Sequence, residues 1–185
     1  MRLFLLYLHI FLFNFPFFSS SSSDFSCHPE DSYALLQFKS SFTTFTNYAC
    51  HEQPQKTSTW KNGTNCCSWH GVTCDTVSGH VIGLNLNLGC ESLQGNIYPN
   101  STLFQLSHLQ SLNLSYNDFF GTHFHSKFGG FQNLTHLDLS LCGFQGEIPP
   151  QISHLSKLTS LHLSRNDQLM IETRINRENK SIIND

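Results

Sequence analysis

The chain has 185 residues, of which 39% are hydrophobic and 12% are charged, with 10 Lys and Arg against 13 Asp and Glu. Ordinary soluble domains are about 25% charged. The sequence therefore lacks the basic excess of a nucleic-acid-binding protein and the charge runs of a disordered tail. Its length suffices for one domain with a buried core.

The first segment predicts a secretory signal peptide. Arg2 precedes an apolar run at 3–18, and five serines follow at 19–23. A charged start, an apolar middle and a small-residue end are typical of a cleaved signal. The run is shorter than the roughly 20 residues of a membrane-spanning helix, although an uncleaved anchor is the alternative. No later stretch is apolar enough to span a bilayer, so we expect a secreted, extracellular chain.

Seven cysteines follow this segment, and secretion favours disulfides between them. No Cys-x-x-Cys pair occurs, so the pattern disfavours a zinc site, and we expect no metal. The cysteines are Cys27, Cys50, Cys66, Cys67, Cys74, Cys90 and Cys142. Asn-x-Ser/Thr sequons, which accept N-linked glycans, occur at Asn62, Asn100, Asn113, Asn133 and Asn179.

Internal repeats organise the second half of the chain. Similar blocks cover 106–121, 131–146 and 155–169, and a degenerate turn precedes them at 84–95. Their spacing of 24 to 25 residues lies within that of leucine-rich repeats, whose pattern is L-x-x-L-x-L-x-x-N/C-x-L. We therefore expect about four repeats, the first and last imperfect.

Each repeat should contribute a short strand with alternate residues on opposite sides. The strands should stack in parallel, because a single repeat has no other way to bury its apolar side. Where the chain turns away from each strand, an inward Asn or Cys can bond backbone groups of neighbouring repeats. The inward leucines are Leu112, Leu114, Leu137, Leu139, Leu161 and Leu163, and the turn residues are Asn117, Cys142 and Asn166. We expect Cys142 to be a buried free thiol.

The segment before the repeats predicts a cap. Pro29 opens a short amphipathic helix, on which Leu35, Phe38 and Phe42 recur at spacings of three and four. Two runs that flank residues 75–79 suit a hairpin. Trp69 is expected to cover the open end of the first repeat's core, as a solenoid requires.

The motifs of the cap and repeats resemble those of plant receptor-like proteins, and most of all the disease-resistance class. The resemblance rests on residues 66–74 (CCSWHGVTC), 34–39 (ALLQFK) and 146–149 (GEIP). It implies an α/β solenoid, a right-handed leucine-rich-repeat superhelix with a disulfide-bonded N-terminal cap and a glycosylated recognition surface. It also implies the disulfide pairs Cys27–Cys66, Cys67–Cys74 and Cys50–Cys90.

We expect four parts: a signal peptide (1–23), a cysteine-rich cap (24–80), about four repeats (81–169) and a polar tail without leucine periodicity (170–185). Members of the family usually have many more repeats and then a membrane anchor. The sequence has no second cysteine cap, anchor or kinase domain, so we expect a truncated ectodomain.

The residues that flank the inward leucines predict a binding face, because solenoids bind ligands on such surfaces. A glycan on Asn113 would obstruct part of this face. The candidate ligand-binding residues are Ser111, Asn113, Ser115, His136, Asp138, Ser140, Ser160, His162 and Ser164.

An enzyme is not expected. His136, Asp138 and Ser140 alternate along one strand, about 6.5 to 7 Å apart, whereas a catalytic triad needs contacts of about 2.6 to 3.2 Å. His123 and His125 supply only two of the roughly four ligands of a structural metal, so we expect a solvated loop there. We expect no cofactor.

The main hypothesis is an extracellular recognition module in the cell-wall space. It would bind a peptide, a glycan or a partner receptor, with a membrane co-receptor as a further partner and no nucleic acid. One alternative is an inhibitor of secreted cell-wall-degrading enzymes; such inhibitors are short solenoids of the same repeat, capped at both ends. The other is a nonfunctional remnant.

Overall fold

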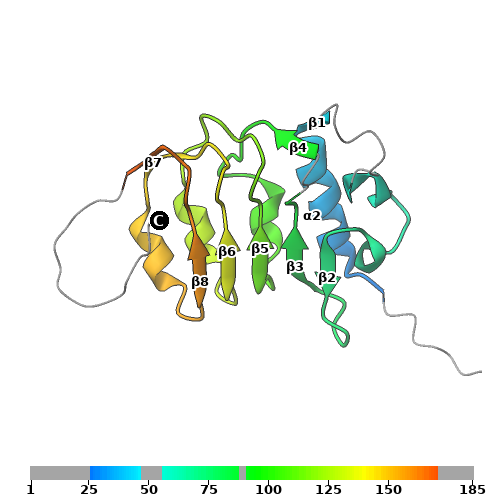
Figure 1. Cartoon of the computed structure of the whole chain (residues 1–185). Coiled ribbons are helices and arrows are strands. Elements are labelled where there is room, and N and C mark those ends of the chain that lie inside the picture. Colours follow the sequence, from blue (N-terminus) through cyan, green and yellow to red (C-terminus); the bar gives the residue numbers. More distant parts are fainter. Residues whose placement is uncertain (1–25, 47–55, 88–90, 171–185) are drawn as a thin grey trace, which may run out of the picture.

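A computed structural model of the chain describes residues 26–46, 56–87 and 91–170. Its centre is a five-stranded sheet in the order β2–β3–β5–β6–β8 (Figure 1). β2 pairs antiparallel with β3, and the other neighbours are parallel. One strand per repeat therefore stacks on the next, which confirms the leucine-rich-repeat solenoid. The strands span Val72–Cys74, Val81–Asn85, Ser111–Asn113, His136–Asp138 and Ser160–His162.

The helix of the cap, α2 (Pro29–Ser40), confirms the predicted helix, and its buried residues lie on one face. Pro29 stands at the start of the helix, where its missing N–H removes no helical hydrogen bond. Leu35 and Phe38 are fully buried. Phe42, which the periodicity placed on the same face, lies beyond the end of the helix. It packs its ring edge-on against Phe38, with centroids 4.9 Å apart.

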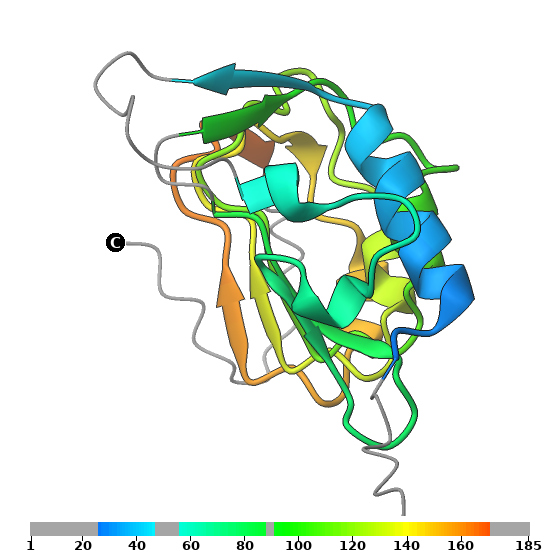
Figure 2. The same cartoon turned by 90° about the vertical axis from the view of Figure 1, so that its right-hand side faces the viewer.

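Short 3₁₀ helices return the chain from one strand to the next. They lie with α2 on one side of the sheet, and no described helix covers the other side (Figure 2). The hydroxyl of Thr102 donates to the Ala34 carbonyl at 2.8 Å, which joins α2 to the first repeat. These helices are η4 (Thr102–Gln105), η5 (Ser126–Gly130) and η6 (Pro150–His154), and two more in the cap are η2 (Lys56–Thr59) and η3 (Cys66–Ser68).

Two disulfides hold the cap together. The adjacent cysteines at 66 and 67 pair with different partners, as the family resemblance implied. One bridge ties the start of α2 to η3, and the other ties η3 to β2. The bridges are Cys27–Cys66 and Cys67–Cys74. The third expected bridge, Cys50–Cys90, lies outside the described residues.

Two stacked tryptophans fill the interior of the cap. Trp60 and Trp69 are each 3% exposed, and their ring centroids lie 5.5 Å apart. Buried indole N–H groups need acceptors. Trp69 donates to the Thr64 hydroxyl at 2.7 Å, and Trp60 donates to the His70 carbonyl at 3.0 Å. The burial of Trp69 agrees with the expected plug, whereas nothing in the repeat pattern predicted the role of Trp60.

The predicted hairpin joins β2 to β3, and Asp75 fixes its turn. The Asp75 carboxylate accepts hydrogen bonds from the backbone N–H groups of Val77 and Ser78 at 3.2 and 2.8 Å. These bonds, that of Ser78 above all, lower the pKa of Asp75. Gly79 has a φ of +74°, and a Cβ there would collide with the Ser26 carbonyl, so this position requires glycine.

Two further strand pairs lie outside the main sheet, and the sequence pattern predicted neither. β1 (Thr43–Thr46) pairs antiparallel with β4 (Glu91–Gln94). β7 (Gln145–Glu147) pairs in parallel with β9 (Gln168–Met170). In Figure 1, β1, β4 and β7 lie along the upper edge of the solenoid, beyond the ends of the main strands.

The inward leucines are buried to different degrees along the solenoid. Leu112 in β5 and Leu137 in β6 are each 1% exposed, whereas Leu161 in β8 is half-buried. The register aligns all three. β5 and β6 have a strand on each side, while β8 has only β6 beside it among the described residues. The missing neighbour explains the difference.

Phenylalanines form much of the core between the repeats. Phe128 is fully buried, and its ring makes edge-on contacts with four others at centroid distances of 5.2 to 6.3 Å. Such pairs are favourable beyond the area that they bury. The four partners are Phe104, Phe124, Phe131 and Phe144.

The predicted turn residues bond backbone groups of adjacent repeats. The Asn117 side-chain amide donates to the carbonyls of Leu86 and Leu114 at 2.9 and 2.7 Å, and its oxygen accepts a backbone N–H at 2.7 Å. Asn166 makes the same kinds of contact. At the intermediate position the Cys142 thiol donates to the Leu114 carbonyl at 2.9 Å. The expected ladder is confirmed.

Candidate recognition surface

The open side of β5, β6 and β8 carries polar side chains in register. We call the six outward residues of these strands the strand face. Because the leucine between each outward pair points into the core, these six point away from it, as predicted. Each is exposed or half-buried. One row is Ser111, His136 and Ser160, and the other is Asn113, Asp138 and His162.

Of the three serines that follow the strands, Ser115 departs from the predicted outward position. Ser164 is exposed and Ser140 is half-buried, but Ser115 is only 1% exposed. Its hydroxyl donates to the Asn113 side-chain oxygen at 2.7 Å and accepts from the Asn87 amide at 3.0 Å. Because the chain turns inward after β5, Ser115 is part of a turn and does not belong to the strand face.

The spacing of about 6.5 to 7 Å that was expected along His136, Asp138 and Ser140 does not hold for the last two residues. Ser140 and Asp138 do touch: the Ser140 hydroxyl donates to the Asp138 carboxylate at 2.6 Å, and its backbone N–H donates at 3.0 Å. Ser140 lies in the turn, not in the strand, so the extended spacing does not apply. The imidazole of His136 pairs instead with the Thr135 hydroxyl at 2.8 Å. The geometry is a turn-stabilising pair, not a nucleophile with its base.

His123 and His125 have separate partners. Nε2 of His123 lies 3.2 Å from the Gln145 amide nitrogen. Nδ1 of His125 accepts the backbone N–H of Lys127 at 3.3 Å, and its ring stacks on that of Phe104. Partial burial, and secondarily the charge of Lys127, lowers the pKa of His125.

None of the cysteines in the described part of the chain offers a thiolate that could act as a nucleophile or bind a metal. Cys142 is free and buried, and burial raises the pKa of its thiol to about 12. The thiolate is the nucleophilic form, so this thiol is unreactive, as predicted. Four cysteine sulfurs gather in the cap, but both pairs are disulfides and therefore do not supply thiolates for zinc.

The sequons differ in accessibility. Asn62 and Asn100 are exposed, whereas Asn113 and Asn133 are half-buried. Asn113 lies on the strand face, and its oxygen accepts two bonds from Ser115. Asn179 lies outside the described residues.

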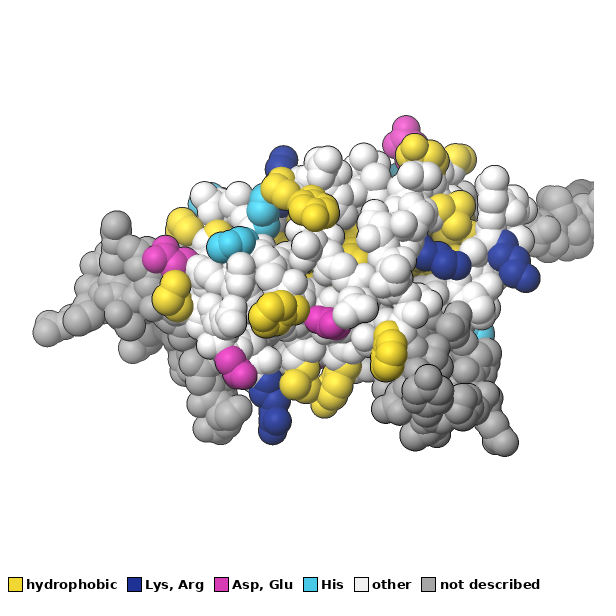
Figure 3. All heavy atoms as spheres, turned by 90° about the horizontal axis from the view of Figure 1, so that it is seen from above, with side chains coloured by type: hydrophobic (Ala, Val, Ile, Leu, Met, Phe, Trp, Pro, Cys, Tyr) yellow, Lys and Arg dark blue, Asp and Glu magenta, His cyan; other side chains and the backbone are white. Residues whose placement is uncertain are grey.

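The upper edge offers a less regular surface than the strand face. Figure 3 looks onto this edge and shows hydrophobic side chains scattered between polar and charged ones, without a continuous apolar patch. Large apolar patches mark many protein-binding sites. The strand face, in which three strands present aligned polar groups, is therefore the better candidate.

Three family models match parts of the chain. The leucine-rich-repeat N-terminal domain matches residues 28–75, and leucine-rich-repeat models match residues 105–122 and 133–155. The first range covers α2, the Cys67–Cys74 disulfide and all of β2. The other two ranges cover the repeats that carry β5 and β6.

Curated plant receptor-like proteins are similar to this chain over most of its length. Receptor-like protein 9DC1 of Solanum pimpinellifolium is 46% identical over 164 residues, which are 83% of this chain and 19% of that protein. Receptor-like protein 6 of Arabidopsis thaliana is 40% identical over 162 residues, which are 80% of this chain and 15% of that protein. The chain thus spans less than a fifth of the length of these relatives.

Solved structures of plant receptor ectodomains share the fold. The PEPR1–AtPEP1 structure has a TM-score of 0.57 and 30% identity, covering 76% of this chain and 18% of that one. The Arabidopsis receptor kinase HAESA with the peptide hormone IDA has a TM-score of 0.58 and 28% identity, covering 77% and 21%.

No helix in the described part of the chain is long and apolar enough to cross a membrane. The parallel repeat strands, the asparagine ladder and the disulfide-bonded cap agree with the family matches and with the sequence identity to the relatives. The chain is a leucine-rich-repeat protein that is homologous over most of its own length to receptor-like proteins of plants.

Proposed function

We propose that this chain is an extracellular recognition module that binds its ligand on the strand face. The carrying observation is the register of β5, β6 and β8, which places two rows of outward polar groups side by side. The ligand is a peptide, a glycan or a partner receptor, and a membrane co-receptor is a further partner.

The chemistry of the strand face supports this function. Hydroxyl, amide, carboxylate and imidazole groups lie within two rows, so the surface both donates and accepts hydrogen bonds. Asp138 is flanked in register by Asn113 and His162.

The similar structures support a peptide ligand in particular. HAESA is described in complex with the peptide hormone IDA, and PEPR1 is described together with AtPEP1. A row of aligned groups suits an extended chain, because equivalent positions recur at each repeat. The two disulfides favour an oxidising, extracellular location.

The test is a binding screen with a matched pair of variants. The secreted chain is immobilised and probed with synthetic plant and microbial peptides and with oligogalacturonides. His136→Ala, Asp138→Ala and His162→Ala together should weaken binding of any hit at least about tenfold, the loss of about 1.4 kcal/mol.

The control variant combines His123→Ala, Glu147→Ala and His154→Ala, which removes the same three groups from exposed positions outside the strand face. It should bind like the unmodified chain. Equal binding by both variants would contradict the assignment. Inhibition of a secreted polygalacturonase, without peptide or glycan binding, would instead identify an inhibitor of cell-wall-degrading enzymes.

A further inference from the structure

Three imidazoles from three segments stack at the junction of the cap and the first repeat. His28 precedes α2, His80 precedes β3 and His108 precedes β5. The ring centroids of His28 and His80 lie 4.0 Å apart, and those of His80 and His108 lie 3.9 Å apart. The stack brings together side chains that are distant in sequence.

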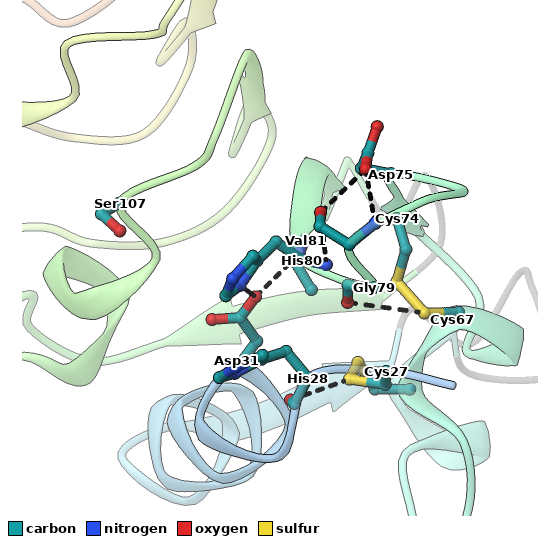
Figure 4. A network of polar contacts seen from close by, with 12 residues as sticks. Cys27, His28, Asp31, Cys67, Cys74, Asp75, Gly79, His80, Val81 and Ser107 are labelled. Carbon is teal, nitrogen blue, oxygen red and sulfur yellow. Dashed lines mark hydrogen bonds and ion pairs between the residues drawn. A yellow bond between two sulfur atoms is a disulfide. The ribbon is translucent and has the colours of Figure 1, made fainter. Parts of the chain in front are cut away.

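A buried carboxylate lies against this stack. Asp31 is 5% exposed, and its Oδ2 accepts the backbone N–H of Val81 at 2.8 Å and lies 3.1 Å from Nδ1 of His80. Figure 4 shows Asp31 and His28 on the helix side and His80 on the strand side. The His80 side chain is 23% exposed, so the cluster opens to solvent there.

The second observation is an unsatisfied nitrogen in the same place. Nδ1 of His28 is the one buried side-chain nitrogen or oxygen without a hydrogen-bond partner among the described residues. Leaving a buried polar atom unpaired is costly, and such atoms in folded proteins call for an explanation. An ion or water that contacts this nitrogen would remove the cost.

We propose that His28, Asp31 and His80 bind a divalent transition-metal ion of the zinc class. Imidazole nitrogens and a carboxylate oxygen are ligands that such ions take, and three protein ligands leave a coordination position for water. The three ligand atoms lie within 4.8 Å of one another. Zinc bonds near 2.0 Å require ligand atoms about 3.3 Å apart, so the rings must turn slightly and close on the ion.

The local charges are compatible with this site. The positive end of the α2 dipole opposes a cation, and the negative charge of Asp31 offsets it. The neighbouring cysteines do not compete for the ion, because they form disulfides. The sequence pattern predicted no metal. Asp31 and His80 are 49 residues apart, so no local spacing reveals this cluster. The bound ion would join α2 to the start of β3.

The experiment titrates ZnCl₂ into the disulfide-intact, EDTA-treated chain at pH 7.5 and follows binding by calorimetry and the melting temperature. We expect saturable binding of one ion and a higher melting temperature. His28→Gln and His80→Gln should each weaken binding by more than about tenfold, whereas His154→Gln, at an exposed position on η6, should leave it unchanged. Binding should weaken at pH 5.5, because the ligating imidazoles must be deprotonated.

A second readout separates loss of the site from loss of the fold. The imidazole NMR signals of His28 and His80 in the unmodified chain should shift on zinc addition, while those of His154 should not. Unshifted signals at both cluster histidines would overturn the proposal. Equal zinc affinity in the cluster variants and the unmodified chain, or no saturable binding, would overturn it as well.

Discussion

The cap and the repeats of this molecule are stabilised by different means. In the cap, two disulfides and a tryptophan pair hold segments that share no period. In the two central repeats, a leucine, an asparagine or cysteine, and a phenylalanine stand at equivalent positions, so each of these repeats completes contacts of its neighbour. An irregular cap therefore depends on covalent bonds, whereas a regular stack depends on repetition.

The largest loss of stability is expected in the phenylalanine core. Phe128→Ala should reduce the free energy of unfolding by about 3 to 5 kcal/mol, because it removes a fully buried ring and leaves a cavity. Urea unfolding would measure it. Phe120→Ala, at a ring that is 69% exposed, is the control and should change stability by about 0.5 kcal/mol or less. Similar losses in both variants would show that the ring contacts do not stabilise the repeats.

In the cap, we expect the disulfides to make a comparable contribution to the free energy of unfolding. Replacing Cys27 and Cys66 together by serine should reduce the free energy of unfolding by about 2 to 5 kcal/mol. Because the loss is in the cap, hydrogen exchange should accelerate in α2 more than in β6. Uniform acceleration along the chain would contradict the separation between cap and repeats.

The predictability of the two regions differs for the same reason. Periodicity predicted the repeat strands of the main sheet, the buried leucines and the ladder at Asn117, because the same residue pattern recurs in each repeat. In the cap, the family resemblance supplied the disulfide pairs, and no period predicted the partner of Trp69. The pairing of β1 with β4 depends on residues far apart in sequence, so local patterns carry no sign of it.

At the candidate site too, the local pattern predicted what depends on the strand alone and missed what depends on distant residues. Strand alternation placed His136, Asp138 and His162 outward correctly, because it is a property of any strand. It misplaced Ser115, whose burial depends on the turn after β5 and on the hydrogen bond from Asn87. Alternation ends where the strand ends, and short strands of three residues end early.

The ladder allows a smaller, graded test within the repeats. Asn117→Ala removes the Asn117 bonds to the Leu86 carbonyl and the Leu93 backbone N–H and leaves the Leu114 carbonyl with the weaker Cys142 thiol donor, so it should cost about 1 to 3 kcal/mol or more. Cys142→Ala removes a weaker donor and should cost less. Urea unfolding of both variants measures the order. A larger loss at Cys142 would mean that packing, not hydrogen bonding, dominates at this position.

The smallest effect concerns the thiol itself. With its pKa raised from 9.0 to about 12, Cys142 should resist iodoacetamide at pH 8 in the folded chain and react in 8 M urea. Because the thiol is harder to deprotonate in the folded chain, its protonated form favours the folded state at pH values below 9.0. This contribution to the free energy of unfolding is lost as the pH rises toward 12. Rapid alkylation of the folded chain would show that the thiol is accessible.

The most direct test of recognition by the strand face uses an introduced glycan that blocks the face sterically. Asp138→Asn creates an Asn-x-Ser sequon with Ser140, which places a glycan at the centre of the face when the chain is secreted from plant cells. The control combines Asp138→Asn with Ser140→Ala, which keeps the substitution and removes the sequon. Mass spectrometry confirms the glycan, and binding of a ligand from the screen is then compared. We expect the glycosylated variant to bind far more weakly than the control, whose own smaller loss reports the Asp138 carboxylate alone; equal binding by the two variants with the glycan in place would contradict recognition by the strand face.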